Sequence, residues 1–373
     1  NGPTRPVEIG NAVGKRPGGR GEGHELSHAL KADMATSPGL LLVAALLLLW
    51  FALRFPFHGV LLASGLAGYV VLIWKRPAWS VFCIPLGLVA LDLAPWSGWY
   101  FLDEFDVLMA LSISVVLARV PGSGSRMHAG DGLMRAATAL VIASYVIGAM
   151  RGLFPLPPLD VGSATLPYSP LNALRLAKGV LWALAMFLLV RRLRRAGYDS
   201  VRLFTRGVLA GLVTVVLVVI WERAAFPGIL ALADVYRVTG PFSQMHVGGA
   251  DLETWLVAAA PMLVIEILSA RSRSARVVGV VLLVASSYCL IVTFSRAAYI
   301  GYGLGLLVAA AIFVWYTRQS SSTKGKQTWL ATASMLGLVG VMLVAGIVVS
   351  PFAKERLARS GNDVSVRMQH WQD

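Results

Sequence analysis

The chain returns repeatedly to apolar runs that are long enough to cross a lipid bilayer. Such runs fold as helices, because backbone polar groups inside a bilayer must be paired within the protein. Hydrophobic residues make up 57% of the 373 residues and charged residues only 14%, which is too little polar surface for a soluble protein of this length. The sequence therefore predicts an all-α fold, a polytopic transmembrane helical bundle. About eleven spans are expected, at 38–53, 57–74, 79–94, 105–118, 133–150, 171–190, 203–221, 252–269, 277–293, 297–316 and 329–349.

The lysines and arginines indicate how this bundle is oriented. Most of the 33 basic residues lie in the N-terminal tail and in alternate connections, which are 75–76, 119–135, 191–206, 271–276 and 318–326. Cytoplasmic connections are enriched in lysine and arginine, so this alternation predicts a cytoplasmic N-terminus. The connections 94–104, 151–170 and 222–251 are then expected outside. The same rule accounts for the net charge of +14, so no nucleic-acid partner is expected.

The chain divides into three segments. Residues 1–36 are polar and rich in glycine, and we expect a disordered or non-native tail in which Met34 is the natural start. Residues 37–350 form the transmembrane helical domain. Residues 351–373 are expected to begin a periplasmic loop, and their pattern stops so abruptly that the chain is expected to be a fragment.

A pair of cations stands near the outer end of the sixth predicted span. Asn172, Arg175 and Lys178 recur at three-residue spacing, so they share one helix face. Two cations on one face repel each other unless an anion lies between them. They either extend to lipid phosphates or form a site for a phosphate-bearing ligand.

The outer connection before the eighth span is rich in glycine and polar residues. It contains Arg237 and His246, and Asp251 and Glu253 fall where the next helix starts, a position at which acidic residues favour the helix dipole. His246 is either a structural hydrogen-bonding residue or a catalytic one. Asp251 and Glu253 also have a spacing that could hold a metal with a sugar phosphate, although short acidic pairs are common.

The stretch Ile291–Gly305, IVTFSRAAYIGYGLG, places Arg296 between two apolar runs without a polar loop around it. A central arginine costs about 2.5–3.5 kcal/mol in lipid, so either it reaches the headgroups or it has a function. Thr293 and Ser295 offer hydroxyl groups beside it. The glycines at 301, 303 and 305 are expected to let a neighbouring helix pack closely.

Further basic and aromatic residues follow the last predicted span. Arg367, His370 and Trp371 would share a face if this stretch is helical. An amphipathic helix lying in the membrane interface explains the same pattern.

Together these motifs resemble the O-antigen ligase and O-antigen polymerase superfamily. The similarity covers about residues 168–373 and is strongest at 236–253 and 291–303, whereas the first half matches only in hydropathy. The residues that carry it are the Tyr236–Phe242 and Met245–Ala250 stretches, the Thr293–Tyr299 stretch, and Arg367 with Trp371.

The resemblance implies a glycosyltransferase of the bacterial inner membrane that acts at the periplasmic face. Such enzymes move a glycan from an undecaprenyl-diphosphate carrier to a hydroxyl of an acceptor glycan or of lipid A core. It also implies diphosphate-binding cations, for which Arg296, Arg237, Arg175, Lys178 and Arg367 are the candidates. The proposed base is a histidine that is expected beyond Asp373, and His246 is the candidate within the chain. Arginines can neutralise a diphosphate leaving group, so no metal or other cofactor is expected, and the partners are the lipid-linked glycan, its acceptor and membrane lipids.

Two other functions fit parts of the same pattern. A transporter or flippase of lipid-linked glycans would share the spans and basic residues, and it would show internal repeats and broken helices. A metal-dependent polyprenyl-phosphate-sugar transferase would instead rely on Asp251 and Glu253. The ligase, the polymerase and other exopolysaccharide enzymes remain open by sequence.

Overall fold

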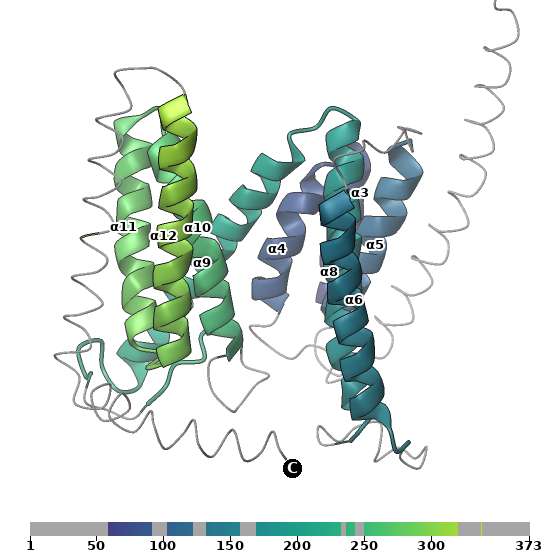
Figure 1. Cartoon of the computed structure of the whole chain (residues 1–373), viewed down its shortest axis with the longest axis horizontal. Helices are drawn as coiled ribbons and strands as arrows, with labels where there is room; N and C mark the ends of the chain where they lie inside the picture. Colours follow the sequence, from purple (N-terminus) through teal and green to yellow (C-terminus); the bar gives the residue numbers. More distant parts are fainter. Residues whose placement is uncertain are drawn as a thin grey trace, which may run out of the picture.

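The computed structural model describes residues 59–91, 103–121, 132–156, 169–232, 236–242 and 250–319, together with Gly337. Within these residues the protein is all-helical, with no β-strand (Figure 1). The helices are α3 (Gly59–Lys75), α4 (Trp79–Leu91), α5 (Glu104–Arg119), α6 (Gly132–Leu153), α8 (Asn172–Arg195), α9 (Ser200–Ala225), α10 (Ala250–Ser269), α11 (Arg273–Ile291) and α12 (Arg296–Gln319).

These helices overlap the second to the tenth predicted spans. Six are long and apolar enough to cross a membrane by length and composition, while α3 and α4 are shorter apolar helices. The prediction of an all-α membrane protein is therefore confirmed. The expected spans at 38–53 and 329–349, the tail 1–36 and the segment 351–373 lie outside the described residues.

Local capping explains where several helices begin. Asp103 and Asp106 form a reciprocal capping box at the start of α5, in which each side chain accepts from the backbone N–H of the other at 2.9 Å. The Ser272 hydroxyl accepts from the Ala275 N–H at the start of α11. These polar capping residues precede apolar runs, so they determine the residue at which each helix begins.

The helices pack around two main apolar clusters. One is built from α9, α10, α11 and α12, with Leu212, Leu256, Leu290 and Tyr302 fully buried in it. The other joins α4, α5 and α8. Helix α9 links the two, because it contacts α4 and α8 as well as α10 and α11.

Glycines set two close helix crossings. A Cβ at Gly207 of α9 would lie 2.3 Å from the Phe82 carbonyl oxygen of α4, so only glycine fits there. A Cβ at Gly305 of α12 would lie 3.2 Å from Pro261 Cγ of α10, and one at Gly301 would lie 3.4 Å from Val257 Cγ1. The predicted close packing is confirmed at Gly305, whereas a Cβ at Gly301 would make an ordinary contact and one at Gly303 meets nothing within 4 Å.

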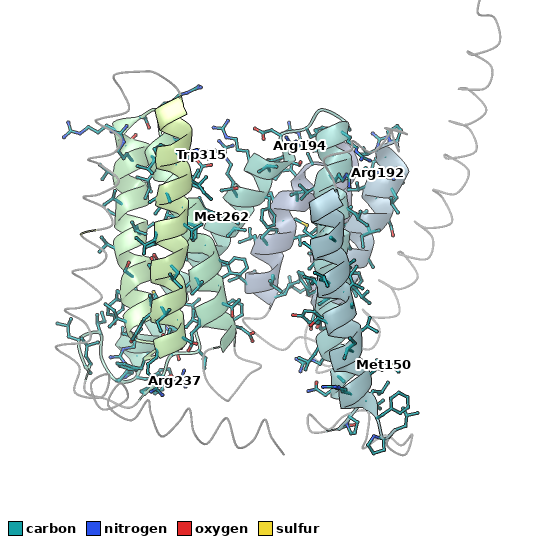
Figure 2. All side chains as sticks on the ribbon, viewed as in Figure 1. Met150, Arg192, Arg194, Arg237, Met262 and Trp315 are labelled. Carbon is teal, nitrogen blue, oxygen red and sulfur yellow. The ribbon has the colours of Figure 1, made fainter. Side chains whose placement is uncertain are left out.

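Arginines lie at both ends of the bundle. Figure 2 shows Arg192 and Arg194 at one end and Arg237 at the opposite end. Arg192 donates from Nε to the Val120 carbonyl at 2.7 Å, and Arg119 donates from Nε to the Trp74 carbonyl at 3.2 Å. These arginines satisfy carbonyl groups at the C-terminal ends of α5 and α3. Arg119 and Arg192 therefore stabilise helix ends, in addition to the role in membrane orientation that the sequence predicts for them.

Candidate functional site

The candidate site begins with the turn between α11 and α12. Phe294 in this turn has a φ of 53° and is 2% exposed. A bulky residue in the left-handed region is strained, and such strain persists only where the surroundings enforce it. Thr293 helps to enforce it, since its hydroxyl donates to the Leu290 carbonyl at 2.7 Å and accepts from the Ser295 N–H at 3.3 Å.

Arg237 docks onto this turn from a distant part of the sequence. Its Nε donates to the Thr293 carbonyl oxygen at 3.1 Å, and its Nη2 lies 2.9 Å from Glu253 Oε1. The Ser295 hydroxyl donates to the other oxygen of Glu253 at 2.6 Å. The 236–242 segment, the first turn of α10 and the α11–α12 turn therefore meet at one point. We call Arg237, Glu253, Thr293, Ser295 and Arg296 the arginine site.

Arg296 completes this site as the first residue of α12. The Ser295 hydroxyl oxygen accepts from the Ala298 N–H at 3.4 Å, so the start of the helix is held beside Glu253. A helix N-terminus carries partial positive charge, and a cation placed there is unfavourable without an anion nearby. Arg296 is partly buried, and the Glu253 carboxylate that binds the preceding Ser295 places negative charge near this N-terminus.

The Glu253 carboxylate is already bound by protein groups and is not free to bind a metal ion. Both of its oxygens are engaged, one by the Arg237 guanidinium and the other by the Ser295 hydroxyl. Asp251, two residues before Glu253 in α10, is exposed. Within the described ranges, no group of three or more His, Cys, Asp or Glu residues has an arrangement that could hold a metal ion.

A second carboxylate, on α9, holds the segment that carries Arg237. Glu222 Oε1 accepts from the Tyr236 hydroxyl at 2.8 Å, and Oε2 accepts from the Gly240 N–H at 2.8 Å. The Thr239 N–H also donates to Glu222, at 3.1 Å to Oε1. Burial, together with the hydrogen bond and negative charge of Glu222, raises the pKa of Tyr236 to about 12. Glu222 was not among the predicted site residues, and its only signal in the sequence was an acidic residue at the end of an apolar span.

The other two predicted cations of the described region lie elsewhere in the bundle. Arg175 and Lys178 belong to α8, which packs against α4, α5, α6 and α9, and α8 lies apart from α10–α12 in Figure 1. Lys178 Nζ is 2.6 Å from Asp106 Oδ2 and 3.4 Å from Asp103 Oδ2. The anion expected near Lys178 is therefore supplied by α5 of the same chain.

The remaining candidates fall outside the described residues. These are His246 in the connection before α10, and Arg367, His370 and Trp371 after the last predicted span. Among the predicted cations, the arginine site accordingly contains Arg237, which contacts Glu253 and Thr293, and Arg296, which follows Ser295 in the chain.

Comparison with protein-family models, with curated proteins and with solved structures finds no match. The fold and the apolar helices define the class as an all-α membrane protein. At one end of its bundle, Arg237 and the Ser295 hydroxyl meet at the Glu253 carboxylate, and Arg296 follows Ser295 at the start of α12. Planar guanidinium groups bind oxyanions through paired N–H donors, so this cluster has the chemistry of an anion site.

Proposed function

We propose that the protein is a membrane-embedded glycosyltransferase of the O-antigen ligase and polymerase type. It would transfer a glycan from an undecaprenyl-diphosphate carrier to an acceptor hydroxyl at the periplasmic face. The observation that carries this proposal is the docking of Arg237 onto the Thr293–Arg296 turn. Two motifs that resemble the family at separate places in the sequence thus adjoin in the fold.

Two guanidinium groups near one another suit a diphosphate better than a single point charge would. The Arg237 contacts in the described structure use Nε and Nη2, which leaves the Nη1 edge for a ligand. Arg296 adds a second planar guanidinium at the N-terminus of α12, where backbone N–H groups and the helix dipole favour phosphate groups. Paired N–H donors match phosphate oxygens in a way that lysine does not.

The chemistry follows from this placement. The bond between the anomeric carbon and the diphosphate oxygen breaks, and a bond from that carbon to the acceptor oxygen forms. The diphosphate leaves with the electron pair, and arginines stabilise the negative charge that develops on it. The acceptor proton passes to a general base, for which a histidine is suited near neutral pH, with His246 as the candidate.

For the membrane arrangement we propose about eleven spans, a cytoplasmic N-terminus and an active face in the periplasm of a bacterial inner membrane. The separation of Arg192 and Arg194 from Arg237 along the bundle supports this orientation (Figure 2). Cysteine-accessibility labelling tests it, and labelling of residues 191–206 from outside would contradict it.

The test of function is transfer by the purified full-length protein, with an undecaprenyl-diphosphate-linked glycan and an acceptor glycan. We expect a covalent product, release of undecaprenyl diphosphate and activity that survives EDTA. Arg237→Gln should lose about a hundredfold in rate. The matched control is Arg273→Gln, an exposed arginine at the start of α11, which should retain the wild-type rate.

Three results would count against the proposal. Movement of the lipid-linked glycan across proteoliposomes without a covalent product would identify a flippase. Loss of transfer in EDTA, restored by a divalent metal, would identify a metal-dependent transferase. Equal rates for Arg237→Gln and wild type would remove Arg237 from the site.

A further inference from the structure

The strongest unexplained feature of the bundle is a buried carboxylate that takes no part in the arginine site itself. Glu222 lies in the last turn of α9 and is 5% exposed. Burying a carboxylate is costly unless hydrogen bonds compensate for lost water. Within the described residues, the hydrogen bonds that Glu222 accepts come from Tyr236, Thr239 and Gly240, in the segment around Arg237.

These contacts bracket Arg237 on both sides. Tyr236, immediately before it, donates through its hydroxyl, and Thr239 and Gly240, shortly after it, donate through their backbone N–H groups. Gly240 has a φ of 60°, a left-handed conformation that suits glycine and lets successive N–H groups point at one anion. Glu222 thus fixes the path of the chain from residue 236 to residue 240.

Successive side chains of this segment have different surroundings, one apolar and one polar. Val238 is fully buried in the cluster of α9–α12, while Arg237 reaches Glu253 and the Thr293 carbonyl. A segment without regular secondary structure has no ladder of backbone hydrogen bonds to hold it. Its position relative to the α11–α12 turn depends on side-chain anchors, and Glu222 is the anchor that contacts three of its residues.

We propose that Glu222 is a positioning residue, which sets where Arg237 presents its guanidinium to the diphosphate. This inference rests on the proposed function and adds to it a residue from α9 that touches no substrate. It differs from a purely stabilising role, because the loss of Glu222 should change anion binding at Arg237 more than it changes the stability of the bundle.

The test compares Glu222→Gln with wild type in detergent solution, using inorganic pyrophosphate as the probe. Glutamine keeps the shape but replaces one acceptor oxygen with an NH₂ group, which cannot accept from a backbone N–H. Hydrogen exchange of the 236–242 peptide should accelerate, while α10 and α11 keep their protection. Pyrophosphate should bind about tenfold more weakly.

Two further variants make the result interpretable. Glu266→Gln, the same substitution on α10, is partly buried and should change neither exchange at 236–242 nor pyrophosphate binding. Tyr236→Phe removes one donor to Glu222 and leaves both backbone N–H contacts in place. It should weaken binding by about threefold, and it keeps the proposal testable if Glu222→Gln fails to fold.

Arg237→Gln separates this inference from the proposed function. Weaker binding in both Arg237→Gln and Glu222→Gln would support the positioning role. Weaker binding in Arg237→Gln alone would overturn it and leave the proposed function standing. Unchanged binding in Arg237→Gln would overturn both, because the arginine site would then not be an anion site.

Discussion

Arg237 and Glu253 form an ion pair with 2.9 Å between Nη2 and Oε1, and Ser295 binds the second oxygen of the same carboxylate. Their side chains are 27% and 16% exposed, so water screens the pair only in part. The pair joins the segment before α10 to the turn before α12. An anionic ligand of Arg237 would meet Glu253 as a neighbour of its own sign.

Glu253→Gln tests that competition. Removing the negative charge while keeping the shape should tighten pyrophosphate binding by about tenfold, equal to ~1.4 kcal/mol. The reason is that the Arg237 guanidinium no longer shares its charge with a carboxylate. Isothermal titration calorimetry measures the change, and weaker binding would show that Glu253 orients Arg237 more than it competes for it.

Arg296→Lys tests the need for a planar guanidinium. The variant should fold and insert normally, because lysine keeps the charge, but it should lose about a hundredfold or more in transfer rate. Rates are compared at matched membrane abundance with a lipid-linked donor. Equal rates would leave Arg296 as a residue that only contacts lipid headgroups.

Lys178→Met tests the ion pair between α8 and α5. It leaves Asp106, which is 4% exposed at its side chain, without its cation, and should lower the free energy of unfolding by about 3 kcal/mol. Trp182 still donates to Asp106 at 2.5 Å. Adding Asp106→Asn should recover much of the loss in a double-mutant cycle. An unchanged thermal midpoint together with weaker pyrophosphate binding would instead assign Lys178 to ligand binding.

Gly305→Leu tests the α10–α12 crossing. Its side chain would enter the space held by Pro261, so we expect a loss of about 1–3 kcal/mol in stability. Gly303→Leu is the matched control, because a Cβ there meets nothing within 4 Å. Thermal unfolding in detergent measures both variants. Equal losses would mean that helix propensity or lipid contact governs this helix, and not the crossing.

Tyr236 gives a prediction for pH. Its pKa in the folded protein is raised to about 12 from an ordinary value of about 10. The neutral hydroxyl therefore stays bound to Glu222 at neutral pH, and its contribution is lost only as the pH rises from about 10 through 12. The ratio of pyrophosphate affinities between wild type and Tyr236→Phe should stay constant from about pH 6 to about pH 9. A ratio that changes within that range would contradict this assignment.

The length and position of the apolar runs were enough to predict the helices. Runs such as 203–221 and 252–269 have one stable solution in a bilayer, since their backbone groups must pair internally. Observed α9 and α10 begin and end within a few residues of those runs. Asp251 and Glu253 at the start of α10 and Gly305 at the α10–α12 crossing were predictable for the same reason, because they act through local geometry. Gly207 at the α9–α4 crossing was not predicted.

The partners of the charged side chains were decided only by tertiary structure. The sequence placed Arg237, Glu253 and Ser295 in three segments, and nothing in their spacing required them to meet. Arg175 and Lys178 were predicted to bind the same diphosphate as Arg237, whereas in the folded bundle Lys178 forms an ion pair with Asp106 on α5. Glu222 could not be predicted as an anchor, because it accepts hydrogen bonds from backbone N–H groups as well as from the Tyr236 hydroxyl, and every sequence offers backbone donors. A local pattern fixes which residues share a helix face, but the choice among possible charge partners depends on which helices pack together, and that is a property of the whole bundle.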